Sequence, residues 1–307
     1  MLDVTLLGTS GTLPLPGRYL SSALIRIGGK LFLIDCGEGT QVALRAKGWG
    51  IRRIDSILLT HSHADHVLGL PGLLLTLAFS QRGAEEPLRI FGPPSVLPVL
   101  ESIRVFAPRL PYPVYFIPLE VGDEVDVTDN LKLFAGPTEH DVPCLSYSLY
   151  VPRSPKFDVE RANSLGVPRD LWGRLQRGES VFVGEREIQP QDVLGPPRKG
   201  LKLVFITDTR FTEDLVSFAS RIQPPDLLIS EGMYGDESMR PKDWDVPHMT
   251  FAEAAKVASA SGARLLWLTH YSPMMADPSR YIENARRIFP NAIAAHDGTE
   301  ISLSYED

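Results

Sequence analysis

The sequence predicts an α/β fold in which two mixed β-sheets pack together and are flanked by helices. Strand-type runs dominate both halves of the chain, and in the last third they alternate with helix-type runs. Such alternation is typical of strands joined through helices, whereas neighbouring strand runs are typical of hairpins. Residues 152–199 break the pattern because they are polar and rich in Pro and Gly. We interpret them as an inserted arm.

The elements before the arm follow from apolar runs bounded by turn residues. Gly28-Gly29 separates two such runs and predicts a hairpin. Strands are expected at 4–7, 23–27, 31–35, 54–60, 88–91, 114–117, 124–127, 131–135 and 146–151. Helices are expected at 40–46, 68–81 and 95–106.

The elements after the arm alternate between strand and helix. Thr250 followed by Glu253 is a capping-box signature for a helix that begins there. Strands are expected at 202–206, 226–230, 265–269, 292–295 and 300–303, and helices at 212–221, 250–260 and 280–288. The predicted organisation is therefore one main domain, made of 1–151 and 200–307, with an insertion at 152–199.

The composition is that of a globular protein, with 43% hydrophobic and 22% charged residues. The net charge of −7 argues against a general affinity for nucleic acid, although residues 150–200 hold nine Lys or Arg against seven Asp or Glu. Two cysteines cannot form a disulfide framework. The N-terminus does not resemble a secretion signal, and no apolar run is long enough to span a membrane, so a cytoplasmic enzyme is expected.

The most informative segment is His61-Ser62-His63-Ala64-Asp65-His66, which follows an apolar strand. Side chains in a loop just past a strand end can converge on one point. Imidazole and carboxylate donors together suit zinc or a similar transition metal. A plain run of polar loop residues is the alternative, and it does not explain three histidines within six positions.

Other polar residues also follow predicted strands. His140 comes after 131–135, Asp208 after 202–206 and His270 after 265–269. Each one alone could be a turn or capping residue. Their shared position beyond strand ends instead predicts a metal site on one rim of the sheets.

Together these motifs resemble the metallo-β-lactamase superfamily and, within it, the ribonuclease Z family of tRNA 3′-processing endoribonucleases. The histidine core marks the superfamily. The resemblance also includes 8–11, 35–40, 195–200, 207–210, 248–250 and 269–271, and of these the loop at 197–200 and the His248 motif are the more specific. The resemblance covers nearly the whole chain and implies an αβ/βα sandwich with an exosite arm that binds tRNA.

The resemblance also implies two Zn²⁺ ions per chain, with Mn²⁺ or another divalent metal as the alternative. One ion would be held by His61, His63 and His140, the other by Asp65, His66 and His270, with Asp208 bridging them. Two such ions can share a hydroxide that attacks the phosphodiester. The products would be a tRNA 3′-hydroxyl and a trailer 5′-phosphate.

Three residues are candidates for the catalytic machinery. Asp65 would accept a proton from the attacking water. His248 would stabilise the phosphate or protonate the departing oxygen, and Glu231 would orient His248. The alternative for His248 is a simple helix-entry residue before Thr250.

The resemblance places RNA contacts in two regions. Arg198 and Lys199 would touch RNA from a loop near the site, unless 195–200 is an ordinary turn. In the arm, Arg169, Arg174 and Arg177 are candidates, with a solvated charged helix as the alternative. Arg169-Asp170 replaces a Gly-Pro pair found in many members of the family. Precursor tRNA and, because members commonly form homodimers, a second copy of the chain are the expected partners.

Two other functions remain as rivals. An arylsulfatase-like or small-molecule phosphodiesterase would share the metal core without needing an RNA-binding arm. A non-catalytic RNA-binding subunit would keep the fold but lack a ligand, whereas the ligand set here is complete.

Overall fold

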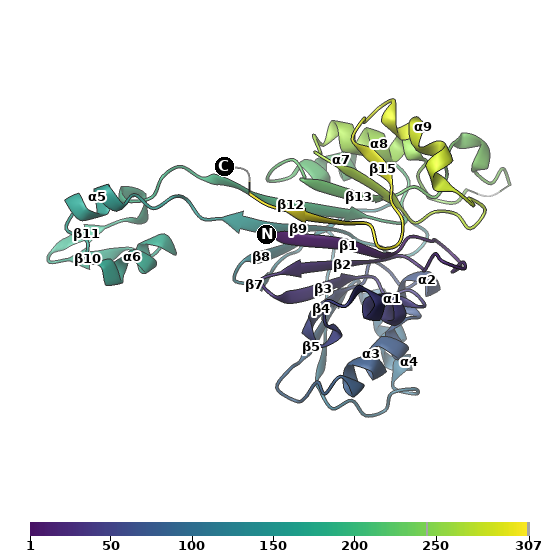
Figure 1. Cartoon of the computed structure of the whole chain (residues 1–307), viewed down its shortest axis with the longest axis horizontal. Coiled ribbons are helices and arrows are strands. Elements are labelled where there is room, and N and C mark those ends of the chain that lie inside the picture. The colour runs from purple at the N-terminus through teal and green to yellow at the C-terminus, as the bar shows by residue number, and fades with distance from the viewer. Residues whose placement is uncertain (244, 306–307) are drawn as a thin grey trace.

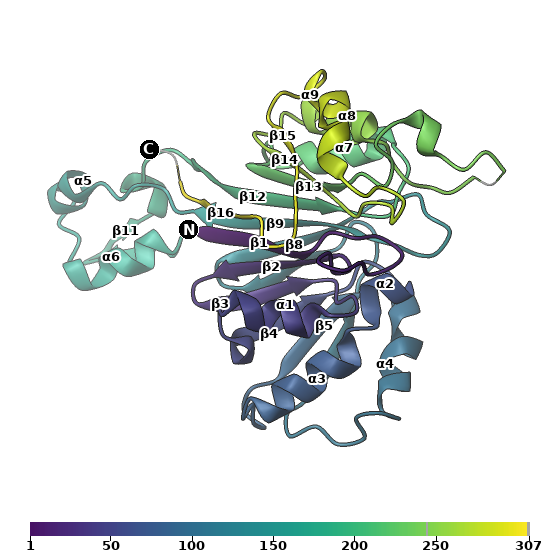
Figure 2. The same ribbon diagram turned by 45° about the vertical axis from the view of Figure 1, so that its right-hand side comes forward.

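The computed structural model describes residues 1–243 and 245–305 and has the two-sheet architecture that the sequence predicts (Figure 1). Each sheet contains seven strands in the described part of the chain. The sheets pack face to face, and helices cover their outer faces (Figures 1 and 2). None of the described helices is long and apolar enough to cross a membrane.

The first sheet has the strand order β16-β1-β2-β3-β4-β5-β6. Its strands are β1 (Leu2–Gly8), β2 (Ser22–Ile27), β3 (Lys30–Ile34), β4 (Ile54–Leu58), β5 (Leu88–Gly92), β6 (Val114–Pro118) and β16 (Glu300–Leu303). The predicted hairpin between β2 and β3 is confirmed, and both turn glycines have positive φ. From β3 to β6 all neighbouring strands are parallel.

The second sheet has the order β15-β14-β13-β12-β9-β8-β7. Its strands are β7 (Glu124–Thr128), β8 (Leu131–Gly136), β9 (Ser146–Arg153), β12 (Arg198–Ile206), β13 (Leu227–Glu231), β14 (Leu266–Thr269) and β15 (Ala292–Ala294). Strands β12 to β15 are parallel, and β9 runs antiparallel to both β12 and β8. Strands β8, β12, β13 and β14 therefore all end at the same edge.

Alternation along the strands builds three apolar layers. On β2, Ile25 faces the other sheet while Leu24 faces the helices, and on β12 Leu203 and Val204 divide in the same way. The first sheet is covered by α1 (Thr40–Lys47), α3 (Leu70–Phe79) and α4 (Leu97–Ile103), and the second by α7 (Glu213–Ser220), α8 (Phe251–Ala260) and α9 (Ile282–Arg286). A buried layer on both faces explains why the strands read as nearly continuous apolar runs.

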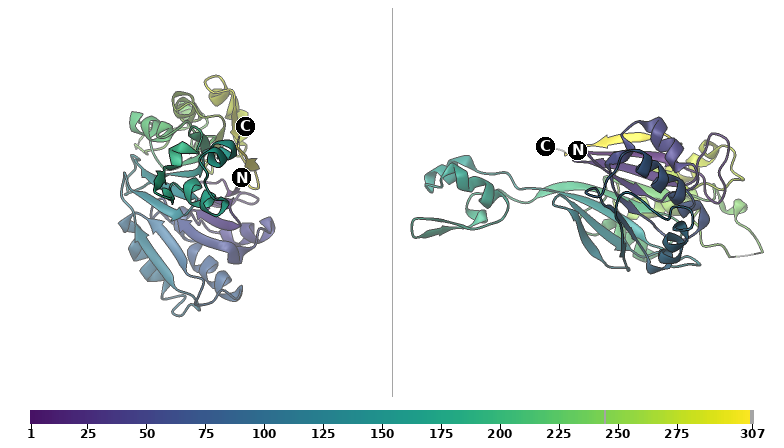
Figure 3. Two further views of the ribbon diagram at one scale, coloured as in Figure 1. Left: turned by 90° about the vertical axis from the view of Figure 1, so that its left-hand side faces the viewer. Right: turned by 90° about the horizontal axis from the view of Figure 1, so that it is seen from below.

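The segment between β9 and β12 projects from one end of the sandwich as an extended arm (Figures 1 and 3). Its elements are α5 (Val159–Ser164), α6 (Arg169–Gln176), β10 (Val181–Val183) and β11 (Arg186–Ile188). They enclose an apolar cluster of their own, made of Ala162, Val167, Leu175, Val181, Ile188 and Val193. The β10–β11 hairpin was not predicted, because its two runs are only three residues long.

Some predicted boundaries were wrong for identifiable reasons. The helix expected at 68–81 is shorter and is preceded by the single turn α2 (Ala64–Val67), since Pro71 favours a new helix start. Strand β12 begins at Arg198 and not at Lys202, because Arg198 pairs with Arg153 at the base of the arm. Residues 198–200 are therefore strand, not the loop that we expected.

Candidate metal centre

The predicted ligands lie at one rim of the sandwich, where strands from both sheets end. The segment from His61 to His66 follows β4, and His140, Asp208 and His270 follow β8, β12 and β14. These strands end at a common rim, and four ligands come from the first sheet and three from the second. The structure therefore brings all seven predicted metal ligands together.

The first group of donor atoms consists of His61, His63, His140 and Asp208, whose ligand atoms all lie within 4.8 Å of one another. His140 Nε2 lies 3.2 Å from His63 Nδ1. Asp208 Oδ2 lies 3.6 Å from His61 Nε2 and 3.8 Å from His140 Nε2. Separations of this size suit several ligands around one cation.

The second group consists of Asp65, His66 and His270. His66 Nε2 lies 3.1 Å from His270 Nε2, and Asp65 Oδ2 lies 3.3 Å from the same His270 atom. Asp208 Oδ1 is 3.3 Å from His66 Nε2 and 3.2 Å from His270 Nε2. One oxygen of Asp208 thus faces each group, which is the geometry of a bridging carboxylate.

The charges in the cluster are strongly coupled. Burial opposes ionisation of Asp208, but the imidazoles of His270, His66 and His61 outweigh it and hold the carboxyl pKa well below its usual range. Burial likewise opposes protonation of His66, yet Asp208, Asp35 and Asp65 raise the pKa of that imidazole well above its usual range. A proton on His66 therefore balances part of the carboxylate charge, a role that a cation would take over.

A buried and unpartnered nitrogen indicates that a metal fits here. His61 Nε2 is inaccessible to solvent and has no hydrogen-bond partner among the described residues, although it lies 3.6 Å from Asp208 Oδ2. A buried polar atom without a partner is costly. The donor set of imidazoles and carboxylates suits a divalent metal, and such an ion would use the lone pair of this nitrogen.

Residues that were not predicted as site residues hold the ligands in place. Asp35 Oδ2 lies 2.7 Å from His66 Nδ1, and Thr60 donates its N–H to Asp35 Oδ1 at 2.8 Å. The N–H of Thr12 donates to Asp65 Oδ2 at 2.7 Å. Carboxylate and amide partners of this kind orient metal ligands. The signal that could have found Asp35 was its place directly after β3, the same signal that identified His140 and Asp208.

The backbone is strained around the cluster. Six described non-glycine residues have positive φ, and four of them are in or next to the cluster, namely Thr12, Asp35, Asp208 and His270. Gly11 has no such φ, but a Cβ there would lie 2.8 Å from His270 Cε1. Strained conformations persist where packing enforces them and concentrate at functional sites.

His248 and Glu231 form a buried pair beside the ligands. Both carboxylate oxygens of Glu231 lie 3.1 Å from His248 Nδ1, and the N–H groups of Thr209 and Met249 also donate to Glu231. Burial disfavours the imidazolium, but the Glu231 carboxylate outweighs it and raises the pKa of His248 to about 9. The His248 ring stacks on His270 with centroids 5.5 Å apart. The predicted interaction of Glu231 with His248 is therefore present in the structure.

Comparison with known proteins identifies the family of the chain. Residues 15–151 match the metallo-beta-lactamase superfamily model, and 188–271 match the beta-lactamase superfamily domain. Ribonuclease Z of Lachnospira eligens is 46% identical over all of this chain and 99% of its own length, and that of Clostridium acetobutylicum is 43% identical over the whole of both. The chain belongs to the ribonuclease Z family.

Solved structures support the same fold at lower identity. Human tRNase Z, short form, is 24% identical, with a TM-score of 0.69 and coverage of 98% of this chain and 99% of its own. The metallo-beta-lactamase fold protein YhfI from Bacillus subtilis gives a TM-score of 0.67 at 19% identity, with 98% of each chain covered. The predicted fold class is therefore confirmed, with a metallo-β-lactamase sandwich as the frame of a ribonuclease Z chain.

The predicted RNA contacts lie away from the ligand cluster. Arg198 and Lys199 begin β12, about ten residues or ~33 Å of extended strand from Asp208, and Lys199 pairs with Asp226 at 2.9 Å. The expectation that they flank the site was wrong, because the strand carries them to the arm's base. In the arm, Arg174 and Arg177 both contact Glu179, and the Arg169 guanidinium lies 5.7 Å from the centre of the Trp172 ring.

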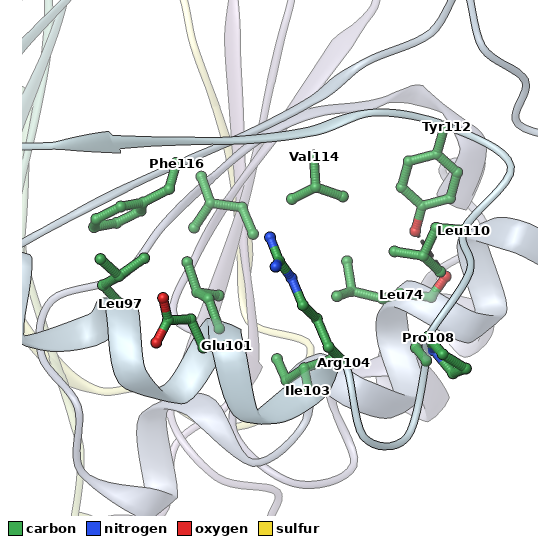
Figure 4. Close-up of a pocket in the computed structure, with 13 residues that line it drawn as sticks. Leu74, Leu97, Glu101, Ile103, Arg104, Pro108, Leu110, Tyr112, Val114 and Phe116 are labelled. Carbon is green, nitrogen blue, oxygen red and sulfur yellow. Dashed lines mark hydrogen bonds between the residues drawn. The ribbon is translucent and has the colours of Figure 1, made fainter.

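Of the hollows in the described part of the chain, one is remote from the ligand cluster and another adjoins it. One, of about 490 Å³, is bounded by α3, α4 and β6, and Arg104 extends into it between apolar side chains (Figure 4). None of its lining residues is a predicted ligand. The other, of about 570 Å³, is lined by Pro93, Pro94 and residues 138 and 140–145, so it adjoins the cluster through His140.

Proposed function

We propose that this chain is a divalent-metal-dependent endoribonuclease that removes the 3′ trailer of precursor tRNA. The observation that supports the proposal is the position of Asp208, whose two carboxylate oxygens face two neighbouring groups of histidine and aspartate side chains that could each hold a metal ion. Full-length similarity to proteins named ribonuclease Z supports tRNA as the substrate. We place the activity in the cytoplasm, where precursor tRNA would be met.

We assign two Zn²⁺ ions to the two groups, with Mn²⁺ or another divalent ion as the alternative. His61, His63 and His140 would hold one, Asp65, His66 and His270 the other, and Asp208 both. When bound, such a pair lowers the pKa of water and neutralises charge on the phosphodiester. The proton transfers are made by side chains of the protein.

Asp65 and His248 divide the proton transfers. The water oxygen attacks phosphorus, Asp65 accepts the water proton, and the bond from phosphorus to the 3′ oxygen breaks. His248, held by Glu231, stabilises the phosphate or gives its proton to the departing 3′ oxygen. The products are a tRNA 3′-hydroxyl and a trailer 5′-phosphate.

The arm supplies affinity at a distance from the chemistry. We assign 152–199 to tRNA binding, with Arg169, Arg174, Arg177, Arg198 and Lys199 as phosphate contacts. Phosphate contacts fix the position of the RNA without reading its sequence. Since the arm projects beyond the sandwich, we further propose a homodimer in which the arm of one copy serves the site of the other.

The test is cleavage of a 3′-extended precursor tRNA by wild type and Asp65→Ala, with the metal content of both proteins measured. Cleavage at the acceptor-stem end by wild type alone, with about two ions per wild-type chain, supports the proposal. Turnover of only a small phosphate or sulfate ester would favour the arylsulfatase-like rival. Tight tRNA binding without any cleavage would favour the non-catalytic one.

A further inference from the structure

Each predicted histidine ligand has one ring nitrogen for the metal and a second that can form a hydrogen bond. The histidines differ in the partner of that second nitrogen. His66 Nδ1 has Asp35, and His61 Nδ1 lies 3.0 Å from the Thr60 hydroxyl. His63 is the most exposed of the histidine ligands, with 36% of its side chain accessible. Its Nδ1 faces His140, so its Nε2 is the nitrogen that points away from the first group.

One charged side chain lies beside that outward nitrogen. Asp141 Oδ1 is 3.7 Å from His63 Nε2, which is ion-pair range but too long for a hydrogen bond. The same oxygen is 2.9 Å from His140 Nε2. One carboxylate oxygen of Asp141 therefore lies within ion-pair range of a ring nitrogen of both His63 and His140.

Metal binding must change these contacts. A cation in the first group needs the lone pair of His140 Nε2, so any proton shared between that nitrogen and Asp141 has to leave. The remaining imidazole donor next to Asp141 is then His63 Nε2–H. A proton on Nε2 is also the tautomer that leaves His63 Nδ1 free for the metal.

We propose that Asp141 is a positioning residue for the first metal site, accepting the Nε2–H of His63 and fixing this exposed ligand with Nδ1 toward the ion. Metal-bound histidines commonly donate their second N–H to a carboxylate. The inference rests on the proposed metal site and extends it to a residue outside the seven ligands. Metal binding by the first group would then depend on a carboxylate that is 62% exposed.

The experiment measures metal occupancy, not RNA cleavage. Wild type, Asp141→Ala and Asp141→Asn are equilibrated against a series of chelator-buffered Zn²⁺ concentrations, and bound metal is determined by mass spectrometry. We expect Asp141→Ala to weaken one of two binding steps by about 10- to 100-fold and to leave the other unchanged. Asp141→Asn should lose less Zn²⁺ affinity, since its amide oxygen can still accept the hydrogen bond from His63 Nε2–H.

The matched control is Glu139→Ala, two positions earlier. Glu139 is 57% exposed against 62% for Asp141, and its carboxylate pairs with Arg210 at 2.8 Å. Its occupancy curve should match wild type. Unfolding midpoints in chelator verify that every variant is folded.

Two results would overturn the proposal. Identical curves for wild type and Asp141→Ala would remove any role in metal binding. Equal losses of Zn²⁺ affinity in Asp141→Ala and Asp141→Asn would mean that the carboxylate charge acts on the ion directly. The role of Asp141 in positioning His63 would then be refuted. A wild type that binds two ions but fails to cut precursor tRNA would instead refute the proposed function and leave this inference standing.

Discussion

At the scale of single residues, several groups outside the seven predicted ligands hold the side chains of the centre in place. Glu231 is fully buried and receives hydrogen bonds from His248 and from two backbone N–H groups. A glutamine there would keep the shape but remove the charge. If the glutamine side chain turned its NH₂ group toward one of these donors, that buried donor would lose its hydrogen bond.

We therefore expect Glu231→Gln to lower kcat for precursor tRNA by about 10- to 100-fold. The carboxylate raises the pKa of His248 to about 9, so removing its charge lowers that pKa. If His248 acts in its protonated form, the decline of activity at high pH should begin at lower pH in the variant. Glu237→Gln, the same change at a carboxylate that is 72% exposed, is the control. An unchanged pH profile would contradict the role of Glu231.

The sequence predicted that the ligand side chains lie together where several chemically similar residues follow the same strand, and the structure brings them together. His61, His63 and His66 follow one strand, and no other interpretation explains them together. Asp35 was not predicted as a site residue because a lone aspartate after a strand also fits a turn. Thr12 acts through its backbone N–H, so its side-chain type carries no signal.

At the scale of elements, an ion-pair cluster joins three neighbouring strands of the first sheet. Asp55 on β4 pairs with Lys30 on β3 at 2.8 Å and with Arg89 on β5. Its side chain is 17% exposed. Burial opposes its ionisation, but hydrogen bonds from Lys30, Arg89 and Ser56 outweigh this and lower its pKa.

Asp55→Asn should therefore cost roughly 1–3 kcal/mol in the free energy of unfolding at pH 7. A carboxyl whose pKa is lowered on folding stabilises the fold above its unfolded pKa of about 4. That stabilisation is lost as pH falls through the folded pKa. The difference from wild type, measured by urea unfolding, should hold from pH 7 to about 4 and then shrink. Asp126→Asn, at a 71% exposed carboxylate, should change little. A difference that grows on acidification would refute this account.

The arm is the element most separable from the rest. Its apolar cluster contains only arm residues, and it is tied to the sandwich through β9 and β12. Replacing 154–197 with a short Gly-Ser linker should leave turnover of a small phosphodiester within about twofold of wild type. Cleavage of precursor tRNA should fall on the order of 100-fold or more, as phosphate contacts are lost. Equal loss of both activities would show that the arm supports the metal centre instead.

Most elements were predictable, and the strand bounds that were missed are those set by pairing partners. Strand β12 reads as a strand only from Lys202, yet pairing with β9 extends it back to Arg198. The short β10 and β11 have too few residues to show alternation. Local sequence cannot reveal a strand end that is set by a partner about 45 positions away.

At the scale of the whole molecule, the ligands join the two sheets. His61, His63, Asp65 and His66 come from the first sheet, and His140, Asp208 and His270 come from the second. The apolar layer between the sheets also includes residues of both, such as Phe32, Tyr147 and Phe205. The two sheets should therefore stay folded without metal, although charged side chains and strained backbone remain where the predicted ligands lie.

Removing bound metal with a chelator should lower the thermal midpoint without unfolding the protein at 25 °C. An ion present at 1,000 times its dissociation constant adds about 4 kcal/mol to the free energy of unfolding. For a chain of this size that corresponds to roughly 6 °C in the thermal midpoint. Adding Zn²⁺ back should restore the midpoint, and this gain should shrink as pH falls from 7 to 5, because protons compete for the imidazoles. Scanning calorimetry across that range is the measurement. If the gain were independent of pH, the ion would be bound through groups other than these histidines, and the assignment of the rim as the metal centre would fail.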